Sequence, residues 1–330
     1  MIGFSARRDT FDGQAIVVLA DGVGQRASIA LHGAVLLGYA MQRAGRLFDV
    51  AAGYRNGAEI LARKGSYFAI LAPFGGRVRD ARYAFEGVEH DLTPGASGIE
   101  RNARHGFVRD RAFDLIDLSS DDSSARATLA TTIAPEPGYP FSIALELTFS
   151  LDQRGLDLNV GMRNLGTQAA PCFFGWHAYF RVGESRLDEW KLTIPARRTV
   201  RTDGELLALA GEAAYADLAA HRELDFRCGQ RIGARVLDTS YLDLAPAPDG
   251  RLYSSLIDRS DGFGIEVWQE RGVMHAFTGD TLGERARMAL ALEPMECMAD
   301  AFNRSEWLQA IRLEPGTSRG FRCGVRRARA

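Results

Sequence analysis

The sequence has few of the residues that mark disulfide-rich or membrane proteins. Its 330 residues include only four cysteines, and no two of them form a Cys-x-x-Cys pair. Four scattered thiols are too few for a disulfide scaffold. No apolar run reaches the roughly 18 residues of a membrane-spanning helix, and the first residues lack the apolar core of a secretory signal. The sequence therefore predicts a cytoplasmic protein with reduced thiols and no membrane span.

Lysine is almost absent. Of the 40 basic residues only Lys64 and Lys191 are lysines, so arginine supplies nearly all of the positive charge. The formal net charge is −2, which gives no global basic field for nucleic acid. The six histidines include no pair at a zinc-binding spacing, so no metal site is expected. The hydrophobic share of 46% is typical of globular proteins and excludes disorder.

Alternation with a period of two residues dominates the hydrophobic pattern. Residues 143–151 and 156–162 each place an apolar side chain at every second position, with a Gly-containing turn between them. Such a pair predicts a β-hairpin with one buried face. Residues 15–19 and 27–31 predict a second hairpin. Further strands are expected over 126–133, 190–194, 254–257, 264–268, 288–292 and 320–325.

Helical patterns are rare. Only residues 204–220, rich in Leu, Ala and Glu, favour a helix. Because long helices do not alternate with strands, βαβ folds are disfavoured. Many short strands between turns indicate a large antiparallel β-sandwich, an all-β fold. No linker or repeat divides the chain, so one domain over residues 1–330 is expected.

Two short motifs match common enzyme signatures by accident. Residues 22–27 fit the G-x-G-x-x-A dinucleotide pattern, but a strand pattern follows them where that site needs a helix. Residues 316–320 fit the G-x-S-x-G nucleophile pattern, but no histidine follows them to complete a hydrolase triad. The sequence therefore favours neither a dehydrogenase nor an α/β-hydrolase.

Three segments carry residues that could do chemistry. The first, 102–107, places a histidine before a glycine in a polar stretch; the second, 173–180, places a histidine among aromatic residues; the third, 289–295, ends an apolar run with a carboxylate before a proline. A histidine among aromatics is either a core residue or a group whose pKa is tuned by burial. The proline is expected to end the third strand.

Together these segments resemble the aldose 1-epimerases, also called galactose mutarotases. The resemblance covers almost the whole chain in the expected order. It is carried by LAPFGGRVRDARYAF (71–85), NARHGF (102–107), FGWHAYFRVG (174–183), LDTSYLDL (237–244) and LEPMECMADAFN (292–303). The family fold is a large antiparallel β-sandwich, and the family interconverts the α and β anomers of free aldohexoses without metal or nucleotide. The resemblance thus implies an isomerase with no cofactor, whose partner is a small sugar.

The same resemblance implies the roles of individual residues. Glu293 corresponds to the catalytic base and His177 to the catalytic acid. The residues that correspond to sugar-binding positions, or lie beside them in the motifs, are His105, Arg77, Asp238, Asn102 and Trp176. Opening the sugar ring needs a proton removed from the anomeric hydroxyl and a proton given to the ring oxygen. We therefore expect an ionised Glu293 and a protonated His177, each favoured by the charge of the other.

Some positions depart from the family pattern. Arg104 stands where an aliphatic residue is usual, Ala178 follows His177 where a proline is common, and Met298-Ala299 replace prolines after the glutamate. Arg104 adds a cation near the expected pocket and leaves the substrate range open. Glu296 is a rival for the base, although Glu293 occupies the matching motif position.

Two alternatives to a mutarotase of free sugars stay open. A hexose-6-phosphate 1-epimerase would need extra cations, which six arginines could supply: Arg77, Arg79, Arg82, Arg101, Arg104 and Arg109. A non-catalytic carbohydrate-binding relative would share the fold without activity. The sequence leaves open whether the protein is a monomer or a homodimer.

Overall fold

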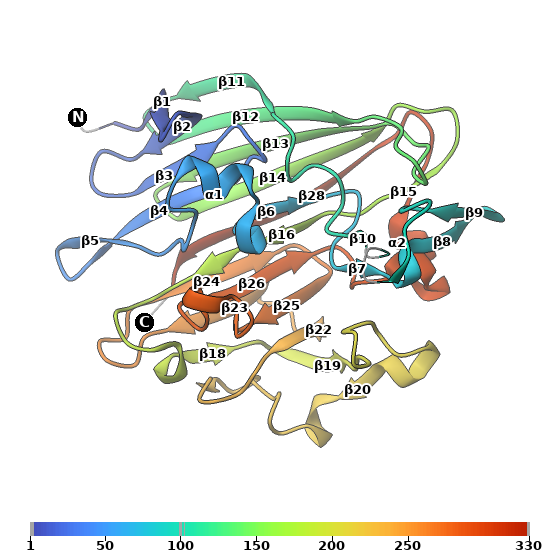
Figure 1. The fold of residues 1–330 in the computed structure, drawn as a ribbon. Helices are drawn as coiled ribbons and strands as arrows, with labels where there is room; N and C mark the ends of the chain where they lie inside the picture. The colour runs from blue at the N-terminus through green and yellow to red at the C-terminus, as the bar shows by residue number, and fades with distance from the viewer. Residues whose placement is uncertain (1–2, 99–100, 102, 329–330) are drawn as a thin grey trace.

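Antiparallel strands are the main regular structure of the computed structural model, which describes residues 3–98, 101 and 103–328 (Figure 1). Every pair of neighbouring strands in this part of the chain is antiparallel. The N-terminal sheet has the order β1(Ser5–Phe11), β2(Gln14–Ala20), β3(Arg26–Ala30), β4(Leu36–Arg43) and β5(Arg46–Asp49). It is a simple meander, in which each strand pairs with the next along the chain.

The largest sheet has nine strands within the described residues. Its order is β11(Asp114–Ser120), β12(Ser124–Ile133), β13(Ile143–Asp152), β14(Gly155–Asn164), β28(Ser318–Arg327), β24(Gly264–Gln269), β23(Leu252–Ile257), β18(Lys191–Thr193) and β21(Gln230–Arg231). The last long strand, β28, lies between β14 and β24 and so joins the first half of the chain to the second.

A third sheet carries the candidate site. Its order is β20(Tyr215–Asp217), β19(Ala196–Val200), β22(Asp238–Leu244), β25(Val273–Phe277), β26(Leu290–Met295), β16(Gly175–His177) and β6(Ala69–Leu71), with β17(Tyr179–Phe180) also paired to β26. Short pairs border it: β7(Arg77–Val78) with β10(Ala103–Arg104), β8(Arg82–Phe85) with β9(Val88–Asp91), and β15(Ala170–Pro171) with β27(Arg312–Leu313).

Helices are short in the described residues. The α-helices are α1(Gly57–Leu61) and α2(Leu308–Ile311), and each spans about one turn. Short 3-10 turns lie at Lys64–Ser66, Arg79–Ala81, Leu187–Glu189, Gly211–Ala214, Leu218–Ala220, Gly283–Arg285, Ala301–Asn303 and Ser305–Trp307. No helix among the described residues is long and apolar enough to cross a membrane.

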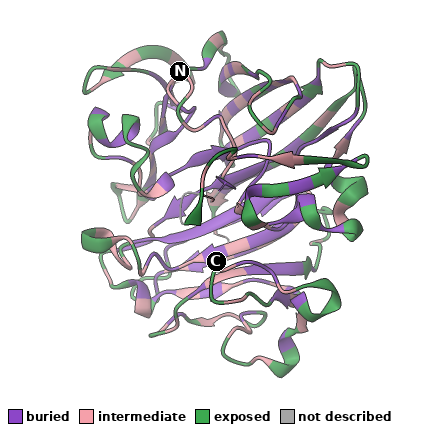
Figure 2. Ribbon diagram, turned by 45° about the vertical axis from the view of Figure 1, so that its right-hand side comes forward, coloured by how far each residue is buried: buried purple, intermediate pink, exposed green. Residues whose placement is uncertain are grey.

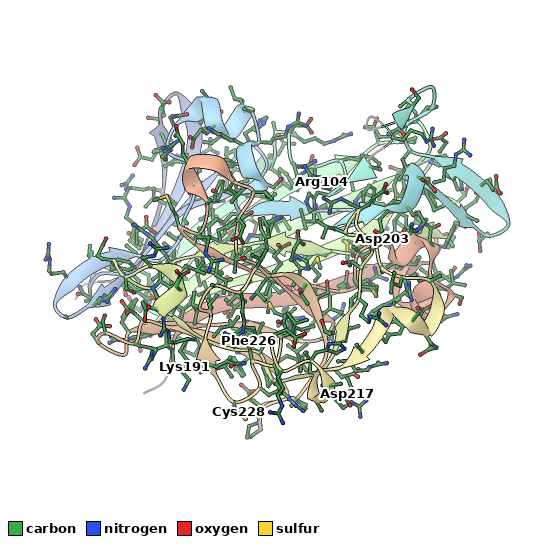
Figure 3. The ribbon with its side chains drawn as sticks, turned by 60° about the horizontal axis from the view of Figure 1, so that its bottom comes forward. Arg104, Lys191, Asp203, Asp217, Phe226 and Cys228 are labelled. Carbon is green, nitrogen blue, oxygen red and sulfur yellow. The ribbon has the colours of Figure 1, made fainter. Side chains whose placement is uncertain are left out.

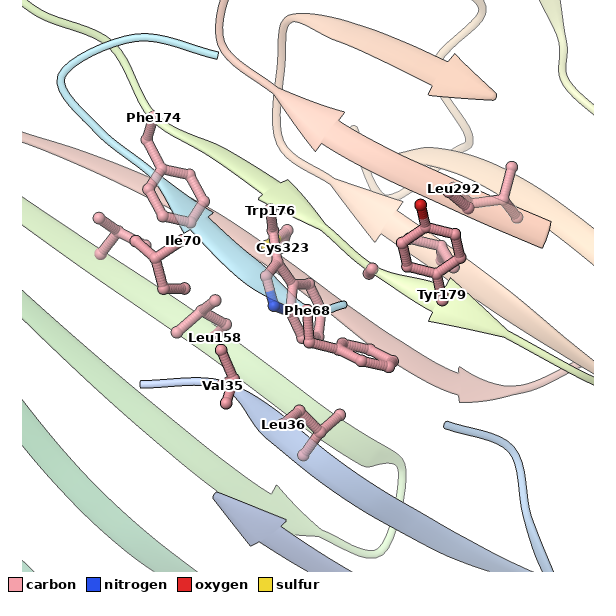
Figure 4. Packing of buried hydrophobic residues seen from close by; sticks show 14 of the residues in the cluster. Val35, Leu36, Phe68, Ile70, Leu158, Phe174, Trp176, Tyr179, Leu292 and Cys323 are labelled. Carbon is pink, nitrogen blue, oxygen red and sulfur yellow. The ribbon is translucent and has the colours of Figure 1, made fainter. Parts of the chain in front are cut away.

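The core lies between the sheets. Phe174, just before β16, packs on Phe321 of β28 with ring centroids 5.5 Å apart, which joins the site-bearing sheet to the largest one. Leu158 and Leu292, one from each of these sheets, belong to the same buried cluster (Figure 4). Figure 2 shows buried residues along the central strands and exposed ones on the outer loops. The predicted all-β antiparallel sandwich is confirmed; a single domain over residues 1–330 stays a prediction.

Both predicted hairpins are present, as β2–β3 and β13–β14, with registers that pair their apolar faces. The sequence predicts that the strand over 288–292 ends before the proline, but β26 continues through Pro294 to Met295. The proline is tolerated because the facing chain pairs with β26 at Gly175, Tyr179 and Phe180 but not at the position opposite Pro294. No ladder hydrogen bond on that side therefore needs the missing N–H of the proline.

The predicted helix over 204–220 is wrong. The segment forms turns and the short strand β20 instead, since its carbonyl groups bond to side chains from elsewhere in the fold. Arg304 donates to the carbonyl oxygens of Leu209 and Gly211, each at 3.0 Å, and Arg79 donates to that of Ala208 at 3.0 Å. Because these bonds replace the helical i→i−4 pattern, tertiary contacts override the local helix preference.

We predict that Arg304→Met loosens residues 204–220. The Arg304 side chain is only 5% exposed, and its loss leaves two carbonyl groups without their donor. The free energy of unfolding should fall by about 2–4 kcal/mol, and thermolysin should cut the segment faster. The matched control is Arg227→Met, whose side chain is more exposed and bonds to Asp225. Equal protease resistance in the two variants would contradict the assigned role.

Candidate active site

A cavity of about 600 Å³ opens over the sheet that contains β22, β25, β26 and β16. Its floor is made by alternate residues of these strands, which point away from the core. Loops form the walls. The floor residues include Asp238, Ser240, His275, Phe277, Glu293, Met295 and His177, and the wall residues include Ser66, Arg77, Arg104, His105, Arg109, Leu206 and Met298.

The strand registers place four polar side chains in one row. Ser240 pairs with His275 across β22 and β25, and His275 pairs with Glu293 across β25 and β26. The register that pairs Gly175 with Met295 puts His177 opposite Glu293. Directly opposite residues in an antiparallel pair have Cβ atoms about 4.5–5.5 Å apart. The row therefore comes from backbone pairing, although its members lie far apart in the sequence.

Glu293 and His177 form the centre of this row. The His177 Nδ1 and Glu293 Oε1 atoms are 3.4 Å apart, and the two side chains are 8% and 4% exposed. No hydrogen bond of good geometry satisfies the buried His177 Nδ1 within the described residues. The His177 ring stacks on Tyr179, with centroids 4.9 Å apart and planes 15° apart. The two side chains are thus held close together without a hydrogen bond between them.

Burial sets the protonation of this pair. Loss of hydration raises the pKa of Glu293, an effect that the nearby His275 charge reduces. Loss of hydration likewise lowers the pKa of His177, and the charges of His275 and Arg109 lower it further. These pKa shifts run against the expectation that mutual attraction keeps Glu293 ionised and His177 protonated. Burial outweighs attraction, and the site favours a neutral acid beside a neutral imidazole.

Glu296, the rival for the base, has a structural role. Its carboxylate accepts the Phe174 backbone N–H at 2.8 Å and pairs with Arg271 at 2.6 Å and Arg319 at 3.2 Å. It does not line the cavity. Glu293 is therefore the glutamate available to a ligand.

His105 is held in the wall by a reciprocal contact with Gly76. The His105 N–H donates to the Gly76 carbonyl at 2.9 Å, and the Gly76 N–H donates to His105 Nδ1 at 3.2 Å. Because Nδ1 accepts, the ring proton of neutral His105 lies on Nε2. Burial, with the charge of His177 next, lowers the pKa of His105 well below its usual value. His105 is thus a neutral donor whose ring meets that of His177 edge to face, with centroids 5.2 Å apart.

Asp238 and His275 form a second acid–imidazole pair. Asp238 Oδ1 lies 3.1 Å from His275 Nε2, and Ser240 Oγ lies 2.9 Å from His275 Nδ1. Burial alone would raise the pKa of Asp238, but the hydrogen bond and charge of His275 keep it below its usual value. Burial alone would lower the pKa of His275, but Asp238 and the charge of Glu293 raise it. His275 was not expected from the sequence, since its only signal is a polar residue within the apolar run of β25.

The predicted sugar contacts divide into three groups. Arg77, His105 and Asp238 line the cavity together with His177 and Glu293. Trp176 does not: its side chain is fully buried, 5.6 Å from Phe68 between ring centroids (Figure 4). The expectation that Trp176 meets the sugar is therefore corrected, because neighbours in a strand point to opposite faces and His177 takes the cavity face. Asn102 lies outside the described residues.

The six arginines expected near the pocket also divide. Arg77, Arg104 and Arg109 line the cavity. The other three are occupied by carboxylates, since Arg79 pairs with Asp203 while Arg82 and Arg101 pair with Asp91.

Among the described residues, no three His, Cys, Asp or Glu side chains gather into a set that could hold a metal ion. The donors of the floor are instead arranged as two acid–imidazole pairs, Glu293 with His177 and Asp238 with His275. Such pairs are suited to moving protons.

This fold and site define a mutarotase-like carbohydrate epimerase as the class of protein. The family model described as aldose 1-epimerase matches residues 15–326, and the chain belongs to that family. A galactose mutarotase from Sus scrofa is 28% identical over 182 residues, which cover 52% of this chain and 51% of that protein. The uncharacterised protein YihR of Escherichia coli K12 is 25% identical over 251 residues, which cover 75% of this chain and 74% of that protein.

Solved structures support the same fold. The galactose 1-epimerase of Lactobacillus acidophilus NCFM has a TM-score of 0.80 at 17% identity, and an aldose epimerase homologue from C. elegans has the same values. In both comparisons 99% of each chain is covered. At this identity the similarity shows the fold alone.

We predict that Gly106→Ala damages the wall that holds His105. Gly106 has φ +63°, and a Cβ atom there would collide with the Ala72 carbonyl group. The free energy of unfolding should fall by about 3 kcal/mol or more, as measured by urea denaturation. The matched control is Gly87→Ala, with φ +79° and open space around the new methyl group. That variant should lose only about 1 kcal/mol, the cost of the left-handed backbone; equal losses would remove the steric argument.

Proposed function

We propose that this protein interconverts the α and β anomers of an aldohexose by acid–base opening and closing of the sugar ring. The observation that carries the proposal is the Glu293–His177 pair, buried and 3.4 Å apart on the cavity floor. The expected cytoplasmic location, and a monomer or homodimer as the working form, remain part of this proposal.

Ring opening requires two proton movements around C1. Glu293 takes the proton of the anomeric hydroxyl, the C1–O5 bond breaks as the C1 carbonyl forms, and His177 gives a proton to O5. Rotation about C1–C2 followed by the reverse transfers closes the ring on the other face. The enzyme ends each turnover with its starting protons. Positioned acid–base groups of this kind each contribute about 10²–10⁴-fold to the rate.

The pair needs one proton in total. The neutral form, with the proton on Glu293, and the reactive form, with the proton on His177, contain the same number of protons. Shifting the proton between Oε1 and Nδ1, which are 3.4 Å apart, therefore reaches the reactive form without exchange with solvent. The pair fails only when it loses this proton or gains a second one.

The other cavity residues orient the sugar. His105 offers its Nε2 proton, Arg77 offers a charged donor, and Asp238 offers a charged acceptor that His275 holds in place. Charge-assisted hydrogen bonds of this type are suited to fixing sugar hydroxyls. Tyr179 and Phe277 supply the aromatic surface of the cavity.

The first test is polarimetry on freshly dissolved α-D-glucose and α-D-galactose in phosphate-free buffer. Added protein should speed the decay to the equilibrium rotation. If no aldose, neutral or anionic, decays faster, the proposal of an epimerase is wrong and a sugar-binding role is favoured instead.

We predict that Glu293→Gln lowers kcat by at least about 10²-fold with the fold retained. The matched variant is Glu296→Gln, a second buried glutamate three residues away that pairs with Arg271 and Arg319. Its urea midpoint should fall, because two arginines lose their partner, while its kcat changes much less. Reversed effects would move the base from Glu293 to Glu296. A change of sugar affinity without a change of rate in Glu293→Gln would indicate a binding protein.

We predict that kcat/KM falls as the pH rises through about 8. Burial raises the pKa of Glu293 to about 8, so above that pH the pair loses its single proton and has no acid left. Exchange NMR of the anomeric signals between pH 5 and 9.5, corrected for the uncatalysed rate, measures this. A rate that rises through pH 8 would instead show an ionised Glu293 working with a separate acid.

His275 also has a raised pKa and provides the control for this profile. The His275→Gln variant should keep the decline and move it to higher pH, since the charge of His275 lowers the pKa of Glu293. Loss of the decline in this variant would assign it to His275 rather than to the Glu293–His177 pair.

A further inference from the structure

The cavity wall carries three arginines that lack an acidic partner. We call Arg77, Arg104 and Arg109 the arginine cluster. All three line the cavity, and within the described residues none of them has a carboxylate oxygen within 4 Å. The neighbouring Arg63 differs, because it pairs with Asp110 at 2.7 Å. Arg63 therefore has an acidic partner, whereas the three arginines of the cluster have none within the described residues.

The backbone forces two of these charges together. Arg77 of β7 lies directly opposite Arg104 of β10 in an antiparallel pair. Like charges in opposite positions of such a pair destabilise it. The positive charge of Arg77, after loss of hydration, lowers the pKa of Arg104. The two guanidinium groups thus repel each other across a short ladder. The charge of Asp238 offsets this repulsion in part, although Asp238 forms no ion pair with either arginine among the described residues.

Arg109 extends the cluster and is held firmly. It donates to Ser66 Oγ and to the Arg104 carbonyl, each at 3.0 Å, while its buried Nε has no partner among the described residues. Loss of hydration, together with the charges of Arg104 and Arg63, lowers the pKa of Arg109 to about 10. An arginine in these surroundings is a ready donor for an anion.

The acidic residues of the cavity cannot balance this charge. The carboxylates that line it are Asp238 and Glu293. Asp238 is engaged by His275 at 3.1 Å, and burial favours the neutral form of Glu293. The floor is therefore close to neutral and one wall is positive.

We propose that the substrate is an anionic aldose, with a phosphate, sulfur oxyanion or carboxylate group held by the arginine cluster while C1 lies over the Glu293–His177 pair. This inference rests on the proposed epimerase function and narrows its substrate class. C6 is the exocyclic carbon of an aldohexose, outside the ring that must open, so an anionic group there can contact the wall while C1 lies at the floor. Guanidinium groups recognise phosphate and carboxylate through charge-assisted, often paired, hydrogen bonds.

The test compares sugars that differ only at C6. Exchange NMR gives kcat/KM, corrected for uncatalysed exchange, for glucose, glucose 6-phosphate, 6-deoxy-6-sulfoglucose and glucuronate, and for the galactose series. At least one anionic sugar should exceed its neutral parent by about tenfold or more, the effect of one charged hydrogen bond. Which one does so identifies the anionic group. The preference should shrink as salt is added.

Two variants connect the preference to the cluster. Arg104→Gln should reduce the ratio of anionic to neutral kcat/KM by about tenfold, and Arg104→Lys should retain part of it. Arg104 suits this test because none of its side-chain atoms bonds to the protein within the described residues. Figure 3 labels it in the upper part of the molecule, apart from Lys191, Phe226 and Cys228 in the lower part. The matched control is Arg82→Gln, an exposed arginine paired with Asp91 outside the cavity, which should keep the ratio.

The outcomes separate this inference from the proposed function. If neutral aldoses exchange as fast as every anionic one, or if Arg104→Gln and Arg82→Gln have the same ratio as the parent, the arginine cluster does not select the substrate and the inference is overturned. The epimerase function would stand in that case. If no sugar of either kind exchanges faster with protein, the proposed function itself fails.

Discussion

The two faces of one antiparallel sheet determine most of this structure. Successive residues in a strand point to opposite sides, so each strand of the site-bearing sheet supplies the core with one half of its residues and the cavity with the other. Leu292 is buried in the core and Glu293 lines the cavity; Trp176 is buried in the core and His177 lines the cavity. The same alternation therefore stabilises the sandwich and presents the acid–base pair.

Burial determines the protonation of the Glu293–His177 pair and also costs folding free energy. A carboxyl group that is 4% exposed and an imidazole that is 8% exposed both resist charging, so burial favours the neutral form of each. The neighbouring Glu296 is a buried carboxyl group in a different environment. Glu296 pairs with Arg271 and Arg319 and does not line the cavity, whereas Glu293 lines the cavity and has no arginine partner among the described residues. The proposed function therefore depends on one buried carboxyl group that no arginine engages among the described residues.

Much of the fold and of the candidate site could be predicted from the sequence, because both depend on hydrophobic alternation and on local motifs. The hairpins β2–β3 and β13–β14 follow from period-two patterns. The motif resemblance pointed to five residues that line one cavity: Glu293, His177, His105, Arg77 and Asp238. Trp176 was misplaced although the same alternation excludes it from the cavity. His275 and the turns of 204–220 could not be read, since they depend on strand registers and on arginines distant in the chain.

The arginine cluster and the acid–base pair are coupled through charge. Arg109 contributes to the low pKa of His177, and all three arginines contribute to that of His105. An anionic group bound at the cluster offsets these positive charges, so the pKa of His177 rises when such a ligand binds. A higher pKa favours the protonated imidazole, the form that protonates the ring oxygen. A neutral sugar gives no such assistance. The arginine cluster therefore has two effects on an anionic substrate. It binds the charged group of the sugar, and the bound charge in turn favours the protonated form of His177.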